Sequence, residues 1–255
     1  MPVSSALETL FKWLCMVSLL IMGLTYFYKD ELPPPNYYDP GYLREPTQQQ
    51  TLQEPFSTRV GGQEYTIEPK FDYELHGVVV SYNDSGGITD IWHHKRWQDF
   101  INLRDLCVIW GKNVETGVYR NMEFHNDSWT CWASWPDSET GSLFAMNALS
   151  NNHLLADNEN IKAALMASEP GDLIRFKGVL AAYANRANGF NRGTSTTRED
   201  TGNGACETVY LDEFEIVKKA NPKIRRLYHL AAWLSIISAV GFAVMFVIAP
   251  VRIDR

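Results

Sequence analysis

The sequence lacks the short motifs that mark the common classes of enzyme. It contains no H-E-x-x-H, no G-x-S-x-G, no Walker loop and no G-x-G-x-x-G. These are the usual signatures of zinc hydrolases, serine hydrolases, nucleoside-triphosphate-binding proteins and dinucleotide-binding proteins. No C-x-x-C occurs among its four cysteines, which removes the zinc-ribbon and thioredoxin-type patterns as well. From motifs we therefore predict no catalytic residue, no metal site and no cofactor.

Cysteine is scarce, and its number restricts disulfide pairing. Cys15 lies in an apolar segment near the N-terminus, which leaves Cys107, Cys131 and Cys206 in the rest of the chain. Because three is an odd number, these cysteines cannot all be paired within one chain. Their apolar or strand-like neighbours favour three reduced, buried thiols, so cysteine does not settle the compartment of the domain.

Two long segments lack charge. Residues 13–28 contain no Asp, Glu, Lys or Arg, and the segment extends to residue 10 if Lys12 places its ammonium among lipid headgroups. Residues 230–249 are uncharged as well, and at about 1.5 Å per residue such a helix crosses a hydrocarbon core of about 30 Å. We predict transmembrane helices over residues 10–28 and 230–249, with the lipid bilayer as one partner.

This pattern predicts a two-pass protein of the plasma (inner) membrane, with the central domain on the side opposite both termini. A cleaved signal peptide is the alternative for the first segment, but the small residues of a cleavage site are missing after its apolar core. No ionisable residue lies within residues 230–249. That absence speaks against a proton relay or an ion path.

Basic residues are unevenly placed around the second apolar segment. Five precede it within residues 218–229, which we interpret as a basic juxtamembrane segment, and two follow it. The positive-inside rule favours a cytoplasmic central domain on this pattern. A long loop is translocated largely regardless of its charge, so the side of the membrane stays open. The seven residues are Lys218, Lys219, Lys223, Arg225, Arg226, Arg252 and Arg255.

Proline and glutamine separate the first apolar segment from the central domain. Residues 29–63 contain six prolines and the run Gln48–Gln50. This composition favours extended, polyproline-like conformations, so we predict a semi-rigid linker. Residues 64–217 are then the soluble domain, and their aromatic content favours a folded core over disorder.

Hydrophobic patterning in the domain predicts mostly strands with brief connections. The predicted strands cover residues 73–82, 106–110, 130–135, 172–183 and 207–217. Helical spacing predicts a short helix within residues 96–103 and a clearer one over residues 158–168, which Asp157 or Asn158 caps.

Three details of this pattern are specific enough to check. The segment Ser150–His153 is polar and predicts a turn. Gly178 predicts a bulge or a bend in its strand, and the last strand predicts a shift in register between Leu211 and Phe214.

The helix followed by Gly171-Asp172-Leu173-Ile174-Arg175-Phe176-Lys177-Gly178 resembles the entry to the fourth strand of small OB-fold domains. The resemblance is to the tRNA-anticodon-binding-like type found in exported or membrane-tethered bacterial proteins. It covers residues 73–217 and implies a mainly β soluble domain, an OB-like five-stranded, partly open barrel with one helix and insertions. Larger insertions after the second and third strands depart from the family. A split β-sandwich of the α+β class is the alternative.

The resemblance also implies where a ligand would bind. OB-type barrels bind over one sheet face, framed by the loops between strands one and two and between strands four and five. The second loop is here residues 184–205, and it presents Arg186, Arg192 and Arg198 at intervals of six. These arginines are candidate binding residues, although a surface insertion without function is the alternative.

Aromatic residues offer further binding candidates. Trp110 and Trp132, with Trp135, could stack on a ligand. Core packing is the commoner role of such strand residues. Nucleic acid fits poorly as the ligand, because residues 46–217 carry 13 Lys and Arg against 24 Asp and Glu, a net charge of −11. Such a surface repels phosphates.

The leading hypothesis is a membrane-tethered binding or scaffolding module that engages a protein partner or assembles as a homo-oligomer. One alternative is a membrane-anchored, metal-assisted hydrolase that uses its histidines, and another is an oligonucleotide-binding domain. Adjacent histidines on an extended segment point in opposite directions and seldom bind one ion together. The sequence names neither the ligand nor the partner. The histidines concerned are His93, His94, His125 and His153.

Overall fold

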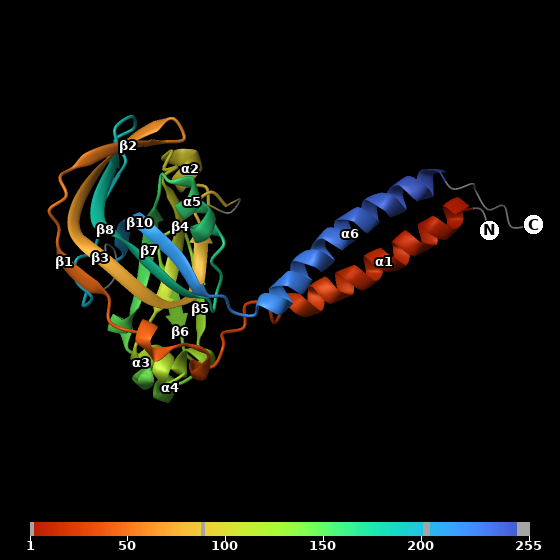
Figure 1. The fold of residues 1–255 in the computed structure, drawn as a ribbon, viewed down its shortest axis with the longest axis horizontal. Helices are drawn as coiled ribbons and strands as arrows, with labels where there is room; N and C mark the ends of the chain where they lie inside the picture. The colour runs from red at the N-terminus through yellow and green to blue at the C-terminus, as the bar shows by residue number, and fades with distance from the viewer. Residues whose placement is uncertain (1–2, 88–89, 201–204, 249–255) are drawn as a thin grey trace, which may run out of the picture. The chain divides into compact units, whose positions relative to one another are not determined.

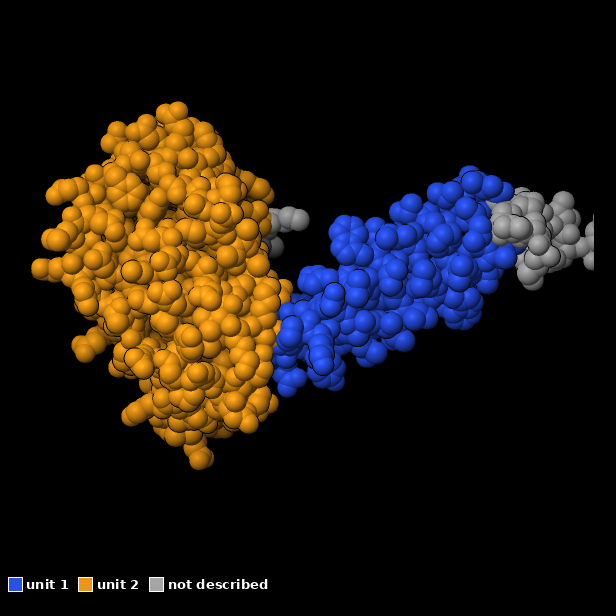
Figure 2. All heavy atoms as spheres, in the orientation of Figure 1, with its two compact units in different colours: residues 1–31, 221–255 blue, residues 32–220 orange. Residues whose placement is uncertain are grey.

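The computed structural model describes residues 3–87, 90–200 and 205–248. The chain divides into two compact units, coloured separately in Figure 2. One unit joins residues 1–31 with residues 221–255, and the other spans residues 32–220. The second unit is a mixed α+β domain with a large sheet, and the first consists of two apolar helices.

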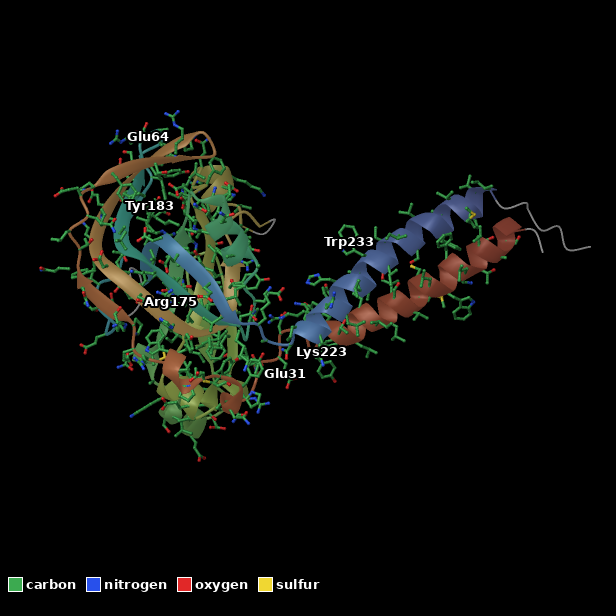
Figure 3. All side chains as sticks on the ribbon, viewed as in Figure 1. Glu31, Glu64, Arg175, Tyr183, Lys223 and Trp233 are labelled. Carbon is green, nitrogen blue, oxygen red and sulfur yellow. A yellow bond between two sulfur atoms is a disulfide. The ribbon has the colours of Figure 1, made fainter. Side chains whose placement is uncertain are left out.

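The helical unit pairs α1 (Val3–Tyr26) with α6 (Pro222–Ile248), which run side by side (Figure 1). Both are long and apolar enough to cross a membrane. Ser235 donates a hydrogen bond of 3.0 Å to Ser18 across the pair, and Trp233, labelled in Figure 3, is exposed. Helix α6 begins eight residues before the predicted apolar segment because Pro222 suits the first helical turn.

The central unit contains strands of very different lengths. The short strands β1, β2, β5, β6 and β9 lie at edges or in connections, and the long strands β3, β4, β7, β8 and β10 build the sheet. The bounds are β1 Thr47–Gln50, β2 Phe56–Val60, β3 Gln63–Asp84, β4 Asn102–Ile109, β5 Glu123–Asn126, β6 Cys131–Ser134, β7 Leu149–Leu155, β8 Leu173–Asn185, β9 Asn191–Arg192 and β10 Glu207–Lys218.

Short helices connect these strands. The α-helices are α2 His93–Arg96, α3 Lys112–Glu115, α4 Ser138–Leu143 and α5 Glu159–Met166. The 3₁₀ turns are η1 Pro35–Tyr37, η2 Pro40–Tyr42, η3 Val118–Asn121 and η4 Met146–Ala148.

Each of the five long strands pairs with two of the others, so the pairings form a closed cycle. Strand β3 pairs antiparallel with β4, β4 with β7, and β8 with both β10 and β3, whereas β10 pairs parallel with β7. Strands β3 and β8 lie side by side over most of their length (Figure 1). Strands β5 and β6 form a separate two-stranded hairpin.

Several local predictions are confirmed. Asn158 caps α5 by accepting hydrogen bonds from the backbone N–H groups of Asn160 and Ile161. The register of β10 shifts between Leu211 and Glu213, as its sequence pattern predicts. Leu211 lies opposite Gly178 on β8, so the missing Cβ and the shift occur at the same place.

Two other local predictions are wrong. The helix predicted within residues 96–103 does not form, because α2 ends at Arg96 and Gln98 has a positive φ of 52°, and β4 then begins at Asn102. The polar turn predicted at residues 150–153 is instead the centre of β7, which pairs with β4 and β10. Tertiary pairing overrides the polar composition of β7.

The proline-rich segment carries more structure than an extended linker would. Within residues 29–63, β1 and β2 both pair with β3, and Tyr38 and Leu43 are buried. The Tyr38 hydroxyl donates to the carbonyl of Gly171 at 2.9 Å. The aromatic and leucine side chains between the prolines bury apolar area against the domain, and this burial holds the segment in place.

Candidate binding site

A row of polar side chains crosses three neighbouring strands on one face of the sheet. Asp105 on β4 lies opposite His153 on β7, and His153 lies opposite Thr208 on β10. Residues directly opposite each other on paired strands point to the same face. All three are buried, and a buried polar group requires a hydrogen-bond partner.

His153 finds its partner in Asp105. Its Nδ1 lies 2.6 Å from Asp105 Oδ1. Burial lowers the pKa of His153, and the neighbouring Asp105 only partly offsets this effect. The imidazole is therefore neutral at neutral pH, with its Nδ1–H donated to the carboxylate and Nε2 left as an acceptor.

A second histidine–carboxylate pair lies at α2. His93 Nδ1 lies 2.7 Å from Asp90 Oδ2, and the other oxygen of Asp90 accepts the backbone N–H groups of Trp92 and His93. Burial raises the pKa of Asp90, but these hydrogen bonds outweigh it, so the pKa is lower than its usual value. Both members of the pair are fully buried.

Arg192 on β9 joins this pair to an aromatic cluster. Its Nη2 lies 3.4 Å from His93 Nε2, and its guanidinium lies 5.7 Å from the ring centroid of Trp129. Trp129 also contacts Trp97 at 4.9 Å between ring centroids, and Trp97 stacks on Phe190. Arg192 thus places its positive charge against His93 and the ring of Trp129.

A cavity of about 1060 Å³ opens beside this row. The β5–β6 hairpin forms one wall with Trp129 and Trp132, and the loop after β8 forms another with Arg192 and Arg198. His153 of the polar row lines the cavity as well. Its volume lies at about the upper end of the range for ligand pockets, roughly 300–1,000 Å³.

A disulfide fixes the hairpin wall. Cys107 on β4 is bonded to Cys131 on β6, so the expectation of reduced thiols is wrong for these two and Cys206 is left as a free thiol of the domain. Cysteines distant in sequence reveal their pairing only once the fold is known. Asn126 adds hydrogen bonds from the hairpin to Ser81 and Asn151.

Three of the five binding residues predicted from the sequence line the cavity. These are Arg192, Arg198 and Trp132, whose ring is half exposed. Arg186 does not line it, because it extends along the surface to Glu64, labelled in Figure 3, and to Thr66. Trp110 is fully buried in the core, where its indole donates to Glu45 at 3.1 Å.

A carboxyl at the start of β10 escaped the sequence analysis. Glu207 lines the cavity, yet only 5% of it is exposed. Burial raises its pKa to about 8, and the nearby Arg198 lowers it only in part. The alternation of β10 could have signalled that residue 207 shares a face with the apolar Val209 and Leu211.

The histidines do not converge on a metal. Within the described ranges, no group of three or more His, Cys, Asp or Glu side chains is placed to hold one. His94 packs against Phe100 and His125 stacks on Trp132, at separate places. Each buried histidine faces one carboxylate, so the metal-assisted hydrolase has no coordinating set among these residues.

Comparisons with protein families, with curated proteins and with solved structures find no match to this chain.

Proposed function

We propose that this chain is a membrane-tethered binding module that holds a segment of a partner protein in the cavity between the β5–β6 hairpin and the loop after β8. Helices α1 and α6 are its two membrane anchors. The cavity, with Trp129 and Trp132 on one side and Arg192 and Arg198 on the other, is the observation that carries the proposal.

The strand pairings support an OB-like barrel as the scaffold. The strands pair in the order β3–β4–β7–β10–β8, and β8 pairs with β3 again. Only the β7–β10 pair among these five is parallel, and α5 lies between β7 and β8 in the chain. In OB-type barrels the binding face is bordered by the loops after the first and fourth strands. Those loops here carry α2 and Arg192, which both adjoin the cavity region.

A protein partner accounts for the exposed side chains at the cavity rim. Trp129, Trp132 and Met146 line the cavity and are each at least two-fifths exposed. Tryptophan is enriched among the residues that contribute most to protein–protein binding. The Cys107–Cys131 disulfide and the Asn126 hydrogen bonds already hold the hairpin in place. Because of this, the hairpin loses little conformational freedom when a partner binds.

Charge argues against nucleic acid as the occupant. The net charge of −11 over residues 46–217 repels a phosphate backbone. Catalysis finds less support than binding, because His93 and His153 are each hydrogen-bonded to a carboxylate and almost fully buried. We treat these pairs as the framework beneath the cavity.

The disulfide favours the oxidising side of the membrane for the central domain. Disulfides persist outside the cytosol and are rare within it. Basic residues before α6 favour the opposite orientation, but a translocated loop of this length is largely insensitive to its charges. We therefore propose that residues 32–220 face the extracytoplasmic side.

Site-specific photocrosslinking in intact cells tests the partner proposal. A photoreactive phenylalanine analogue replaces Trp132 or Met146 at the cavity, and Leu52 serves as the control because it is 97% exposed and does not line the cavity. We expect one adduct of constant mass from both cavity positions and none from residue 52. Equal adducts at all three positions, or none at the cavity, would contradict the proposal, and an adduct of two copies would replace the partner by a homo-oligomer.

A further inference from the structure

Three buried side chains from different strands surround the guanidinium of Arg198. Its central carbon lies 5.9 Å from the ring centroid of Tyr73 on β3 and 6.0 Å from that of Trp110, which follows β4. Glu207 at the start of β10 is the third. Tyr73, Trp110 and Glu207 are each at least 95% buried. Two aromatic rings and a carboxyl group are the chemistry that recognises an organic cation.

Arg198 fits this site incompletely. In the described part of the chain, Arg198 Nε and Glu207 Oε2 are buried atoms without a hydrogen-bond partner. Among the described residues no ion pair joins Arg198 to Glu207, so the nitrogen atoms of Arg198 and the carboxyl oxygens of Glu207 are more than 4.0 Å apart. A buried carboxyl without a close cation is costly when ionised, and burial raises the pKa of Glu207 to about 8.

We propose that Tyr73, Trp110 and Glu207 form a cation site beside the cavity, reached through Glu207 in its lining, which takes a guanidinium or ammonium group of the partner in place of Arg198. The inference rests on the proposed binding function and specifies the chemistry of the bound segment. Arg198 belongs to the loop after β8 and is a substitute occupant supplied by the chain itself. A basic side chain of the partner that approaches Glu207 more closely makes the ion pair that Arg198 does not.

The surroundings prepare the site for such a group. The indole N–H of Trp110 is engaged by Glu45 Oε2 at 3.1 Å, which fixes the ring. Both Glu207 and Arg198 line the cavity, so an occupant of the cavity reaches them directly. The net charge of −11 over residues 46–217 favours a basic partner by long-range attraction.

An anionic occupant fits the same cavity less well. Arg192 and Arg198 line it, but Glu199 and Asp200 line it too and equal them in number, and Glu207 adds a third carboxyl group. Arg192 is directed to His93 and Trp129, and its charge acts to lower the pKa of Asp99 and of His153. Its Nη2 and ring contacts thus lie within the domain, while its Nη1 is buried without a hydrogen-bond partner.

Guanidinium itself is the probe that tests the site. In the full-length protein in detergent, Arg198→Ala removes the internal occupant, and the thermal midpoint is measured by tryptophan fluorescence with guanidinium chloride or sodium chloride at about 10 mM. We expect guanidinium to raise the midpoint of Arg198→Ala by about 3 °C relative to sodium, as for a ligand with a Kd of about 1 mM. The wild type and Arg186→Ala, a surface arginine outside the cavity, should show no rise.

The carboxyl is tested in the same background. Arg198→Ala combined with Glu207→Gln should lose the guanidinium-specific rise, and an equal rise in both variants, or none in Arg198→Ala, would overturn the cation site. Arg198→Gln repeats the measurement if Arg198→Ala does not fold. This assay needs no partner, so failure here with crosslinking at Trp132 overturns the cation site alone. A guanidinium effect without any crosslinked adduct overturns the partner proposal instead.

Discussion

Cys107 on β4 is joined by a disulfide to Cys131 on β6. Asn151 on β7, the cross-strand neighbour of Cys107, donates hydrogen bonds to the carbonyl of Trp129 and to the thiol of Cys206. The hairpin is therefore attached to the sheet by a covalent bond and by amide hydrogen bonds at adjacent positions. This attachment holds the tryptophan wall of the cavity against the polar row of Asp105 and His153.

Removing the disulfide should destabilise the domain. Cys131→Ser removes a disulfide between residues that are 24 positions apart. The chain entropy that such a crosslink removes from the unfolded state corresponds to about 3 kcal/mol of stability. Urea unfolding of the full-length protein in detergent, followed by tryptophan fluorescence, measures the loss. Cys206→Ser is the matched control and should cost less than about 1 kcal/mol, because that thiol makes only weak hydrogen bonds. An unfolding midpoint that reductant leaves unchanged would contradict a structural disulfide.

Labelling of intact cells should place the central domain outside the cytoplasm. Single cysteines replace Arg186, whose side chain is largely exposed, or Arg255 in the C-terminal tail, in a chain with Cys15→Ala and Cys206→Ser. A membrane-impermeant maleimide should label residue 186 in intact cells and residue 255 only after lysis. The reverse pattern would support the cytoplasmic orientation that the basic residues before α6 favour.

Local signals in the sequence predicted local structure well. The cap of α5 at Asn158 and the alternation of β8 are encoded within a few residues, so both were found. Strand β7 was missed because Asn151, Asn152 and His153 are polar yet buried, and their partners lie on other strands. Those partners are known only after the strands are paired.

In the candidate site, too, the features that depend on strand pairing could not be predicted from the sequence. The spacing of Arg186, Arg192 and Arg198 could not reveal that only the last two line the cavity, because β9 pairs with β8 and turns the loop. The pairing of Cys107 with Cys131 and the convergence of Tyr73, Trp110 and Glu207 depend on strands far apart in the sequence. Composition alone contains no such information.

Gly178 should tolerate no side chain. A Cβ built there would lie 2.0 Å from the carbonyl oxygen of Tyr210 on the paired strand, which is backbone and cannot rotate away. Gly178→Ala should therefore destabilise the domain by about 3 kcal/mol or more in urea unfolding, since β8 and β10 must separate. Gly193→Ala is the control, because nothing lies within 4 Å of a Cβ there. Equal stability of the two variants would contradict the close approach of β8 and β10.

Glu207 should make the domain less stable as the pH rises. In the folded domain burial raises its pKa from the ordinary 4.5 to about 8, so between these values the folded state holds a proton that the unfolded chain has released. Stability falls with pH wherever the folded state binds more protons. The groups that interact with Glu207 are Arg198 and Asp200 from the loop, Tyr73 from β3 and the neighbouring Cys206.

Glu207→Gln removes this titration while keeping the size of the side chain. The variant should gain stability over the wild type as the pH rises from about 5 to about 8, by up to on the order of 4 kcal/mol. Thermal unfolding of both proteins across this range measures the difference, in which the shared effects of other buried groups such as Asp99 and His153 cancel. Asp212→Asn on the same strand is the comparison, because burial raises the pKa of this exposed carboxyl too, and it should show a smaller gain than Glu207→Gln. A difference between Glu207→Gln and the wild type that does not change with pH would show that Glu207 is ionised and paired in the folded domain. It would also overturn the proposal that a cation of the partner replaces Arg198 beside Tyr73 and Trp110.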